Sequence, residues 1–279
     1  MSAQPRRPIA LFTLLLVLAG CSGPLYGPPH GMLYIVGGAA SLDNYREFIE
    51  LAGGPDARIV VIPTAGGAET YDGERVLGEW RERYGATNVV MLHTTDRAMA
   101  DSDSFVGVLQ GADAVFFLGG RQWHLVDAYY GTRTHQEFER VLERGGVIGG
   151  SSAGASIQAS FLARGAVEGN TLMIAPEPEH RVGLGFLRNA TVDQHIDRRD
   201  RWDDLREIVL EHPRLIGIGI SEATAVIVEK DRFRVSGRGK VAVHDYFRRF
   251  AYPDTIHYLL LEPGQGYDMR TRRPTPAIR

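Results

Sequence analysis

Cysteine is nearly absent from this 279-residue chain, in which Cys21 is the only one. A disulfide needs two cysteines, so no internal disulfide can form. A strong charge of one sign is also lacking, because the formal net charge is only -3 and no long run of like charge occurs. This composition excludes a disulfide-rich fold and gives no indication of a nucleic-acid partner.

Metal-binding motifs are missing as well. The sequence contains no His-Glu-x-x-His, no cysteine cluster and no pair of histidines at ligand spacing. The segment EPEH, at Glu177–His180, is the one weak exception. We therefore expect neither a metal ion nor another cofactor.

The N-terminal apolar run, Ile9–Leu18, is too short to span a bilayer comfortably. Two arginines precede it and small residues follow it, which is the layout of a secretory signal. It leads into Leu-Ala-Gly-Cys, which resembles the bacterial lipobox, whose cysteine is lipidated.

We expect residues 1–21 to be a lipoprotein signal peptide. Lipid on Cys21 would anchor the exported protein to the bacterial membrane, on its periplasmic or cell-surface side, and would leave no thiol for catalysis. The alternative is an ordinary cleaved signal with Cys21 nearby by chance.

Residues 22–31 are rich in proline and glycine and are expected to form a tether. After them, apolar runs of strand length alternate with polar-apolar stretches of helix length. The runs are MLYIVGGA, ARIVVIPTAGG, TNVVMLHTT, ADAVFFLGG and GGVIGGSS, and the stretches cover residues 44–51, 72–84 and 101–110. Because the runs lack strict alternation, they suit strands buried on both faces, as in a parallel sheet.

This order predicts an α/β fold with a doubly wound, mainly parallel sheet and helices on both faces. The letters THQE, starting at Thr134, fit a capping box that opens a helix through Glu143. Past Asn189 the pattern changes to a β-rich C-terminal part with hairpins, one of them turning near EKD. No internal repeat is present, and we expect a single domain over residues 32–279.

The segment Gly150–Gly154 matches G-x-S-x-G, the nucleophile elbow. In such an elbow a strained turn between a strand and a helix projects the serine hydroxyl, here that of Ser152. The flanking glycines are needed because any Cβ there would collide with neighbouring backbone. A predicted strand precedes the motif and a small-residue helix follows it. The alternative is a glycine-rich turn whose serine has no chemical role.

A serine nucleophile needs a base, and His195 is the best candidate. It lies in ATVDQHIDRRDRWDDL, between an apolar stretch and a highly charged one, just past a predicted strand end. The alternative is a solvated loop histidine. Five other histidines lie in helix or strand patterns and are expected to be packing or surface residues: His93, His124, His135, His212 and His257.

A third group must orient the histidine, and Glu222 lies in the midst of a strongly apolar strand pair, GIGISEATAVIV. A buried carboxylate there needs a partner, and His195 would be a suitable one. An exposed hairpin glutamate is the alternative. The arginines that follow the histidine could hold a substrate carboxylate, or could pair with the neighbouring aspartates on a helix surface.

Together, FFLGGRQ, GGSSAGAS, DQHIDRRDR and GIGISEATA resemble peptidase family S51, which includes cyanophycinase and aspartyl dipeptidases. The resemblance covers about Met32 to Asp245. It implies an α/β fold similar to the class I glutamine amidotransferase domain. It also implies a serine peptidase whose expected substrate is an acidic peptide, α- or β-aspartyl.

The resemblance also implies roles for individual residues. Ser152 is the implied nucleophile, His195 the base and Glu222 the third member of the triad. The other implied site residues are Gly120 and Ala153 for the oxyanion hole, Gln122 as a site-lining glutamine, and Asp193, Gln194, Arg199 and Arg201 on the substrate side.

One position departs from the family pattern. The cyanophycinase branch usually carries a further arginine where this chain has Asp204. The reversed charge is expected to alter recognition of an aspartate-rich polymer decorated with arginine.

Two functions remain as alternatives to a peptidase of family S51. An α/β-hydrolase esterase also uses G-x-S-x-G, but its partners follow in the order serine, acid, histidine, whereas the order here is serine, histidine, glutamate. A lipoprotein binding module without catalysis would be compatible with the change at Asp204 but would not need an intact set of Ser152, His195 and Glu222. The oligomeric state stays open, a homodimer included.

Overall fold

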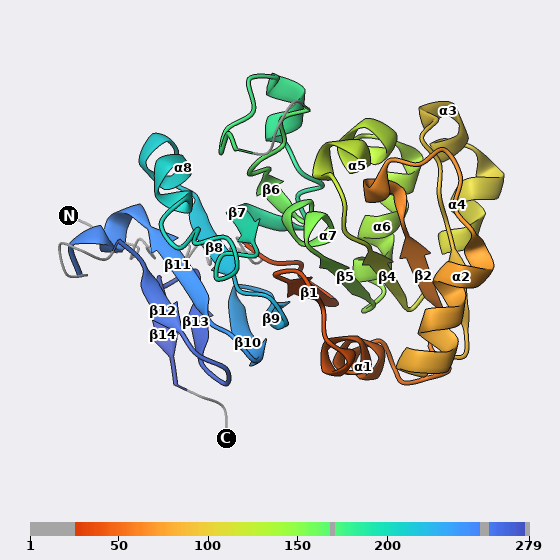
Figure 1. Ribbon diagram of the computed structural model, residues 1–279, viewed down its shortest axis with the longest axis horizontal. Coiled ribbons are helices and arrows are strands. Elements are labelled where there is room, and N and C mark those ends of the chain that lie inside the picture. The colour runs from red at the N-terminus through yellow and green to blue at the C-terminus, as the bar shows by residue number, and fades with distance from the viewer. Residues whose placement is uncertain (1–25, 168–170, 252–256, 277–279) are drawn as a thin grey trace, which may run out of the picture.

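A computed structural model describes residues 26–167, 171–251 and 257–276 of the chain (Figure 1). The predicted signal peptide and the lipidation site at Cys21 lie outside these residues. Among the described residues, no helix is long and apolar enough to cross a membrane.

The end of the predicted tether is packed rather than free. Tyr26 is buried, and its backbone N–H donates to Asp231 Oδ1 over 2.9 Å. Gly27 donates its N–H to the carbonyl of Lys230 over 2.7 Å, and Arg188 donates its N–H to the carbonyl of Tyr26. The prediction of a tether through residue 31 is therefore wrong for these residues, because an aromatic ring and satisfied backbone groups hold them against the fold.

A parallel sheet forms the first half of the fold, as predicted. Its five parallel strands are β1 (Met32–Val36), β5 (Val147–Ser151), β4 (Ala114–Phe117), β2 (Ile59–Ile62) and β3 (Val89–Met91), side by side in that order. Four antiparallel strands extend the sheet beyond β1: β9 (Thr224–Glu229), β10 (Arg232–Gly237), β13 (Gly266–Asp268) and β14 (Arg273–Thr275). The hairpin predicted near EKD is the β9–β10 pair.

Helices cover both faces of this sheet (Figure 1). They are α1 (Leu42–Leu51), α2 (Gly73–Gly78) continued by η2 (Glu79–Tyr84), α3 (Arg97–Ala100), α4 (Asp103–Leu109), α5 (Gln122–Tyr129) and α6 (Arg133–Glu143). In β1, Tyr34 and Val36 pack with α1, α2 and η2, whereas Leu33 and Ile35 pack with α4, α5 and α6. Strands with apolar side chains on both faces explain the unbroken apolar runs in the sequence.

Helix α6 begins two residues earlier than the letters THQE predict. Its N-cap is Thr132, whose side chain accepts the N–H of His135 over 3.3 Å. Thr134 lies inside the helix, and its hydroxyl donates to the carbonyl of Ala100. Glu137 does not reach back to the cap, because its carboxylate pairs with Arg140. The predicted capping box is wrong by two residues.

A second sheet accounts for the predicted β-rich part. It contains β12 (Leu259–Leu261), β11 (Val241–Asp245), β8 (Ile216–Ile220), β7 (Leu187–Gln194) and β6 (Ala159–Phe161), in that order. Helix α8 (Leu205–Glu211) connects β7 to β8, which run parallel. The remaining short helices are η1 (Thr64–Gly66), α7 (Ala153–Ser156), η3 (Pro178–Arg181) and η4 (Tyr246–Ala251).

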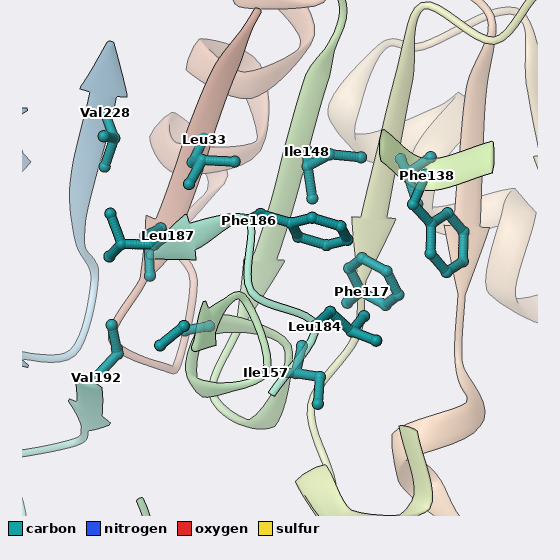
Figure 2. Packing of buried hydrophobic residues seen from close by; sticks show 14 of the residues in the cluster. Leu33, Phe117, Phe138, Ile148, Ile157, Leu184, Phe186, Leu187, Val192 and Val228 are labelled. Atoms are coloured by element: carbon teal, nitrogen blue, oxygen red, sulfur yellow. The ribbon is translucent and has the colours of Figure 1, made fainter. Parts of the chain in front are cut away.

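The two sheets share one hydrophobic cluster. Figure 2 shows Phe186 and Leu187 lying between Leu33 and Ile148 of the first sheet and Val192 of the second. This packing brings the carboxyl end of β7 next to the carboxyl ends of β1 and β5. Because parallel strands end at the same edge of a sheet, the segments that follow β1, β4, β5, β7 and β8 gather there.

Candidate active site

Ser152 lies in the sharp turn between β5 and α7. Its backbone has φ 58° and ψ -115°, a sparsely populated conformation for a residue with a side chain, which costs about 1–3 kcal/mol. The flanking glycines are required sterically: a Cβ on Gly150 would overlap the carbonyl of Gly154, and a Cβ on Gly154 would overlap the carbonyl of Phe117. The turn is thus built as the nucleophile-elbow motif predicts.

His195 follows β7 directly and reaches Ser152 across the junction of the two sheets. Its Nε2 lies 3.0 Å from Ser152 Oγ. The backbone at His195 is also left-handed, with φ 57°, and its N–H donates to the carbonyl of Gly37 over 2.6 Å. Gly38 must lack a side chain, because a Cβ there would fall on the imidazole ring. The residues after β1 therefore fix the position of the histidine.

Glu222 completes a line of three side chains. Its Oε1 lies 2.6 Å from His195 Nδ1. The sequence-based expectation about its surroundings is wrong, since Glu222 is not within an apolar strand pair. It lies in the turn from β8 to β9, which belong to different sheets, and its side chain is 29% exposed. Asp197 holds this turn by accepting the N–H of Glu222 over 2.9 Å.

Gly120 and Ala153, predicted for an oxyanion hole, lie in the two turns that border Ser152. Ala153 is the first residue of α7. A Cβ on Gly119 would lie 3.4 Å from Ser152 Cβ, so the turn after β4 touches the turn after β5. Gly120, with φ 147°, packs against Ala65 so closely that a side chain would overlap its carbonyl. A residue with a side chain therefore cannot occupy position 120 without displacing this turn.

Gln122, predicted to line the site, is buried, and its side-chain amide hydrogen-bonds to the backbone of a neighbouring segment. Its Nε2 donates to the carbonyl of Ala163 over 2.8 Å and to that of Arg164 over 2.7 Å. The amide therefore joins the start of α5 to the segment that follows β6.

Asp193 and Arg164 form a buried ion pair beside this segment. Asp193, on β7, is 1% exposed, and Arg164 Nε lies 3.2 and 3.3 Å from its two carboxylate oxygens. Burial raises the pKa of the Asp193 carboxyl, and the Arg164 guanidinium opposes that shift. Arg164 Nη2 also bonds to Asp204. Asp204 is therefore neutralised by an ion pair.

Arg201, Arg199 and Gln194 lie around Asp193 with different exposure. Arg201 is mostly buried, and its Nη1 lies 4.0 Å from Asp193 Oδ1. Burial, with Arg164 nearby, lowers the pKa of Arg201. Arg199 is exposed, and its backbone N–H donates to the carbonyl of His195 over 3.0 Å. The buried Gln194 donates its backbone N–H to Asp193 Oδ1 over 3.0 Å.

Sequence reasoning missed Arg164 and Asp197. A single arginine within FLARGA, between apolar residues, was the available signal that a buried cation needs a carboxylate partner. At the EPEH segment, His180 Nε2 lies 2.8 Å from Asp127 Oδ1. Within the part of the chain that the structure describes, no three His, Cys, Asp or Glu side chains gather as a metal-binding group.

Comparison with known proteins identifies the family. The family model for peptidase family S51 matches residues 33–236. The chain belongs to peptidase family S51. It is a serine-type peptidase, and the family resemblance noted in the sequence is confirmed, as is the α/β fold.

S51 relatives match most of the chain. It is 28% identical over 263 residues to a cyanophycinase from Geminocystis herdmanii, covering 88% of this chain and 96% of that protein. It is 30% identical over 292 residues to a cyanophycinase from Nostoc sp., covering 99% of this chain and 92% of that protein. A crystal structure of a peptidase from an acI-B1 Actinobacterium superposes with a TM-score of 0.63 at 25% identity, over 86% of this chain and 97% of that one. The chain is a cyanophycinase-like S51 peptidase.

Proposed function

We propose that the protein hydrolyses amide bonds of aspartyl peptides, α- or β-linked, through a catalytic triad of Ser152, His195 and Glu222. The observation that carries the proposal is the unbroken line from Ser152 Oγ to His195 Nε2, 3.0 Å, and from His195 Nδ1 to Glu222 Oε1, 2.6 Å. Nucleophile, base and orienting carboxylate stand within hydrogen-bond reach, which is the geometry that serine acyl transfer requires.

In the first half of the reaction, Ser152 Oγ attacks the amide carbonyl while His195 Nε2 takes its proton. Glu222 accepts the Nδ1–H of the imidazole, so that Nε2 is free to act as the base, and then stabilises the imidazolium. The tetrahedral oxyanion is held by the backbone N–H groups of Gly120 and Ala153, which lie in the two turns beside Ser152.

In the second half, His195 gives its proton to the leaving nitrogen, and the amine departs. A water molecule then enters, loses a proton to His195 Nε2 and attacks the acyl-enzyme ester. The carboxylic acid product leaves as the proton returns to Ser152 Oγ. Each step transfers one proton to or from the His195 imidazole, which ends the cycle as it began, and no cofactor is required.

An acidic substrate is favoured by the charges beside the triad. Arg201 and Arg199 follow His195 in the chain, and Arg201 points toward Asp193 without a close hydrogen bond at Nη1. A guanidinium can hold a carboxylate through two parallel hydrogen bonds. Similarity to cyanophycinases makes cyanophycin itself a candidate, and the Arg164–Asp204 pair supports this, because the negative charge of Asp204 is not left uncompensated.

The test is hydrolysis of cyanophycin and of α- and β-aspartyl dipeptides by the full chain in detergent. Ser152→Ala is expected to lower kcat at least about 10³-fold. Ser151→Ala, one residue earlier and itself buried, is the matched control and is expected to keep kcat within a few-fold. Labelling of Ser152 by a fluorophosphonate supports the nucleophile independently of the substrate. An intact chain that neither turns over these peptides nor labels would favour a binding module.

We further propose that the protein is exported and anchored by lipid on Cys21. The support is the arginine pair, the apolar run and the Leu-Ala-Gly-Cys sequence at residues 6–21. Incorporation of labelled fatty acid that is lost in Cys21→Ser would support the anchor, whereas equal labelling of both would contradict it. The homodimer stays a prediction, which sedimentation of the purified chain would check.

A further inference from the structure

Arg164 is a buried arginine that bonds to two carboxylates near the triad. Its side chain is 4% exposed, Nε faces both oxygens of Asp193, and Nη2 bonds to Asp204. Its backbone has φ 56°, the left-handed region, which disfavours residues with a side chain. A costly conformation and a buried charge at one residue indicate that the position of this guanidinium matters to the protein.

The backbone of Arg164 is held on two sides. Gln122 Nε2 bonds to the carbonyls of Ala163 and Arg164, and the N–H of Arg164 donates to the carbonyl of Met173 over 2.9 Å. Gln122 lies two residues after Gly120, in the turn that borders Ser152. A chain of contacts thus runs from the predicted oxyanion turn through Gln122 and Arg164 to Asp193, two residues before His195.

The charges of this cluster explain what Arg164 does. Asp193 has two cations in reach, Arg164 in direct contact and Arg201 at 4.0 Å. Arg201 Nη1 is buried and has no hydrogen-bond partner among the residues that the structure describes. Without Arg164, Arg201 would be the remaining cation beside Asp193 and would move onto it. With Arg164 present, Asp193 and Asp204 are neutralised, and Arg201 retains hydrogen-bonding capacity.

We propose that Arg164 is a positioning residue that determines specificity: it neutralises Asp193 and Asp204, so that Arg201 remains available to bind a carboxylate of the substrate. This inference rests on the proposed peptidase function. Arg164 acts through Arg201 and does not take part in the chemical step at Ser152.

Arg164→Met is the first variant. It is expected to raise KM for an aspartyl dipeptide at least about tenfold, the size of one lost charge-assisted contact. The rate at which a neutral fluorophosphonate labels Ser152 is expected to stay within threefold, because the triad is unchanged. Arg164→Lys keeps the charge but not the paired Nε contact and is expected to lie between wild type and Arg164→Met.

A rescue separates positioning from folding. In Arg164→Met, the buried Asp193 carboxylate loses its closest cation, and the variant can fail to fold. The double variant Arg164→Met/Asp193→Asn has no such charge, and it is expected to fold and to recover most of the lost KM. Asp204→Asn, changed at a partly exposed side chain, removes one anion and is expected to lower KM for the acidic peptide about threefold.

Two results would overturn the proposal. One is an unchanged KM in folded Arg164→Met, or a KM of the double variant that stays well above that of Asp193→Asn. The other is a parallel loss of labelling and kcat that Asp193→Asn does not rescue. Failure of the proposed function is recognised separately, because the wild-type chain would then neither hydrolyse aspartyl peptides nor label at Ser152.

Discussion

The contact between Glu222 and His195 allows a quantitative test of the proposed triad. In Glu222→Gln the side chain keeps its size but loses its charge, and its amide can donate a hydrogen bond to Nδ1. An amide donating there favours the imidazole tautomer with the proton on Nε2, which cannot accept the proton of Ser152 Oγ. The change therefore removes the charge that stabilises the imidazolium and also disturbs the tautomer.

The size of the effect follows from the geometry. Two unit charges whose centres lie about 4 Å apart interact by about 4 kcal/mol at an effective dielectric constant near 20. Because the Glu222 side chain is 29% exposed, solvent screening reduces this to about 3 kcal/mol. At about 1.4 kcal/mol for each factor of ten, kcat is expected to fall about 10²-fold from the charge alone, and further from the wrong tautomer.

The assay is steady-state hydrolysis of the best aspartyl peptide. The control is Glu207→Gln, a charge-neutralising change at an exposed glutamate of α8. Thermal unfolding of both variants shows whether the fold is kept. A folded Glu222→Gln chain that retains kcat within threefold of wild type would refute the assignment of Glu222 to the triad.

Three further predictions concern the surroundings of the site. Asp197→Ala removes the acceptor that holds the Glu222 turn and is expected to lower kcat about tenfold, whereas Asp197→Asn keeps an acceptor and most of the activity; equal activity of both variants and wild type would contradict this. Gly154→Ala places a methyl group on the carbonyl of Phe117 and is expected to destabilise the fold by several kcal/mol in urea unfolding, about 3 or more, whereas Gly107→Ala in α4 has open space and is expected to be neutral or stabilising by up to about 1 kcal/mol. Burial lowers the pKa of His244 to about 4, so its neutral form stabilises the fold above pH 6.5 and this stability is lost as the pH falls toward 4; relative to His244→Asn, wild type is expected to lose up to about 3 kcal/mol between pH 7 and pH 4, and parallel pH profiles would refute it.

Much of the fold and of the site was predictable from the sequence, for local physical reasons. Unbroken apolar runs such as ARIVVIPTAGG predict strands that are buried on both faces, and they lie in the parallel sheet. The glycines around Ser152 predict a turn where a Cβ cannot fit, and each would indeed overlap a carbonyl. His195 follows an apolar segment at the end of β7. These features depend on the residue itself and on a few neighbours in the chain.

The remaining features depend on which segments the tertiary structure brings together. Glu222 and His195 are 27 positions apart, and their contact requires that β8 and β7 run parallel with their carboxyl ends at one edge. Arg164 meets Asp193 and Asp204 across 29 and 40 positions, so sequence reasoning treated Asp204 as an isolated change of charge. The sequence by itself determined the α/β order and the serine turn, and it singled out the histidine that lies beside the serine. Only the tertiary structure decided which carboxylate each cation meets, because strand register and sheet packing set distances that residue types alone do not.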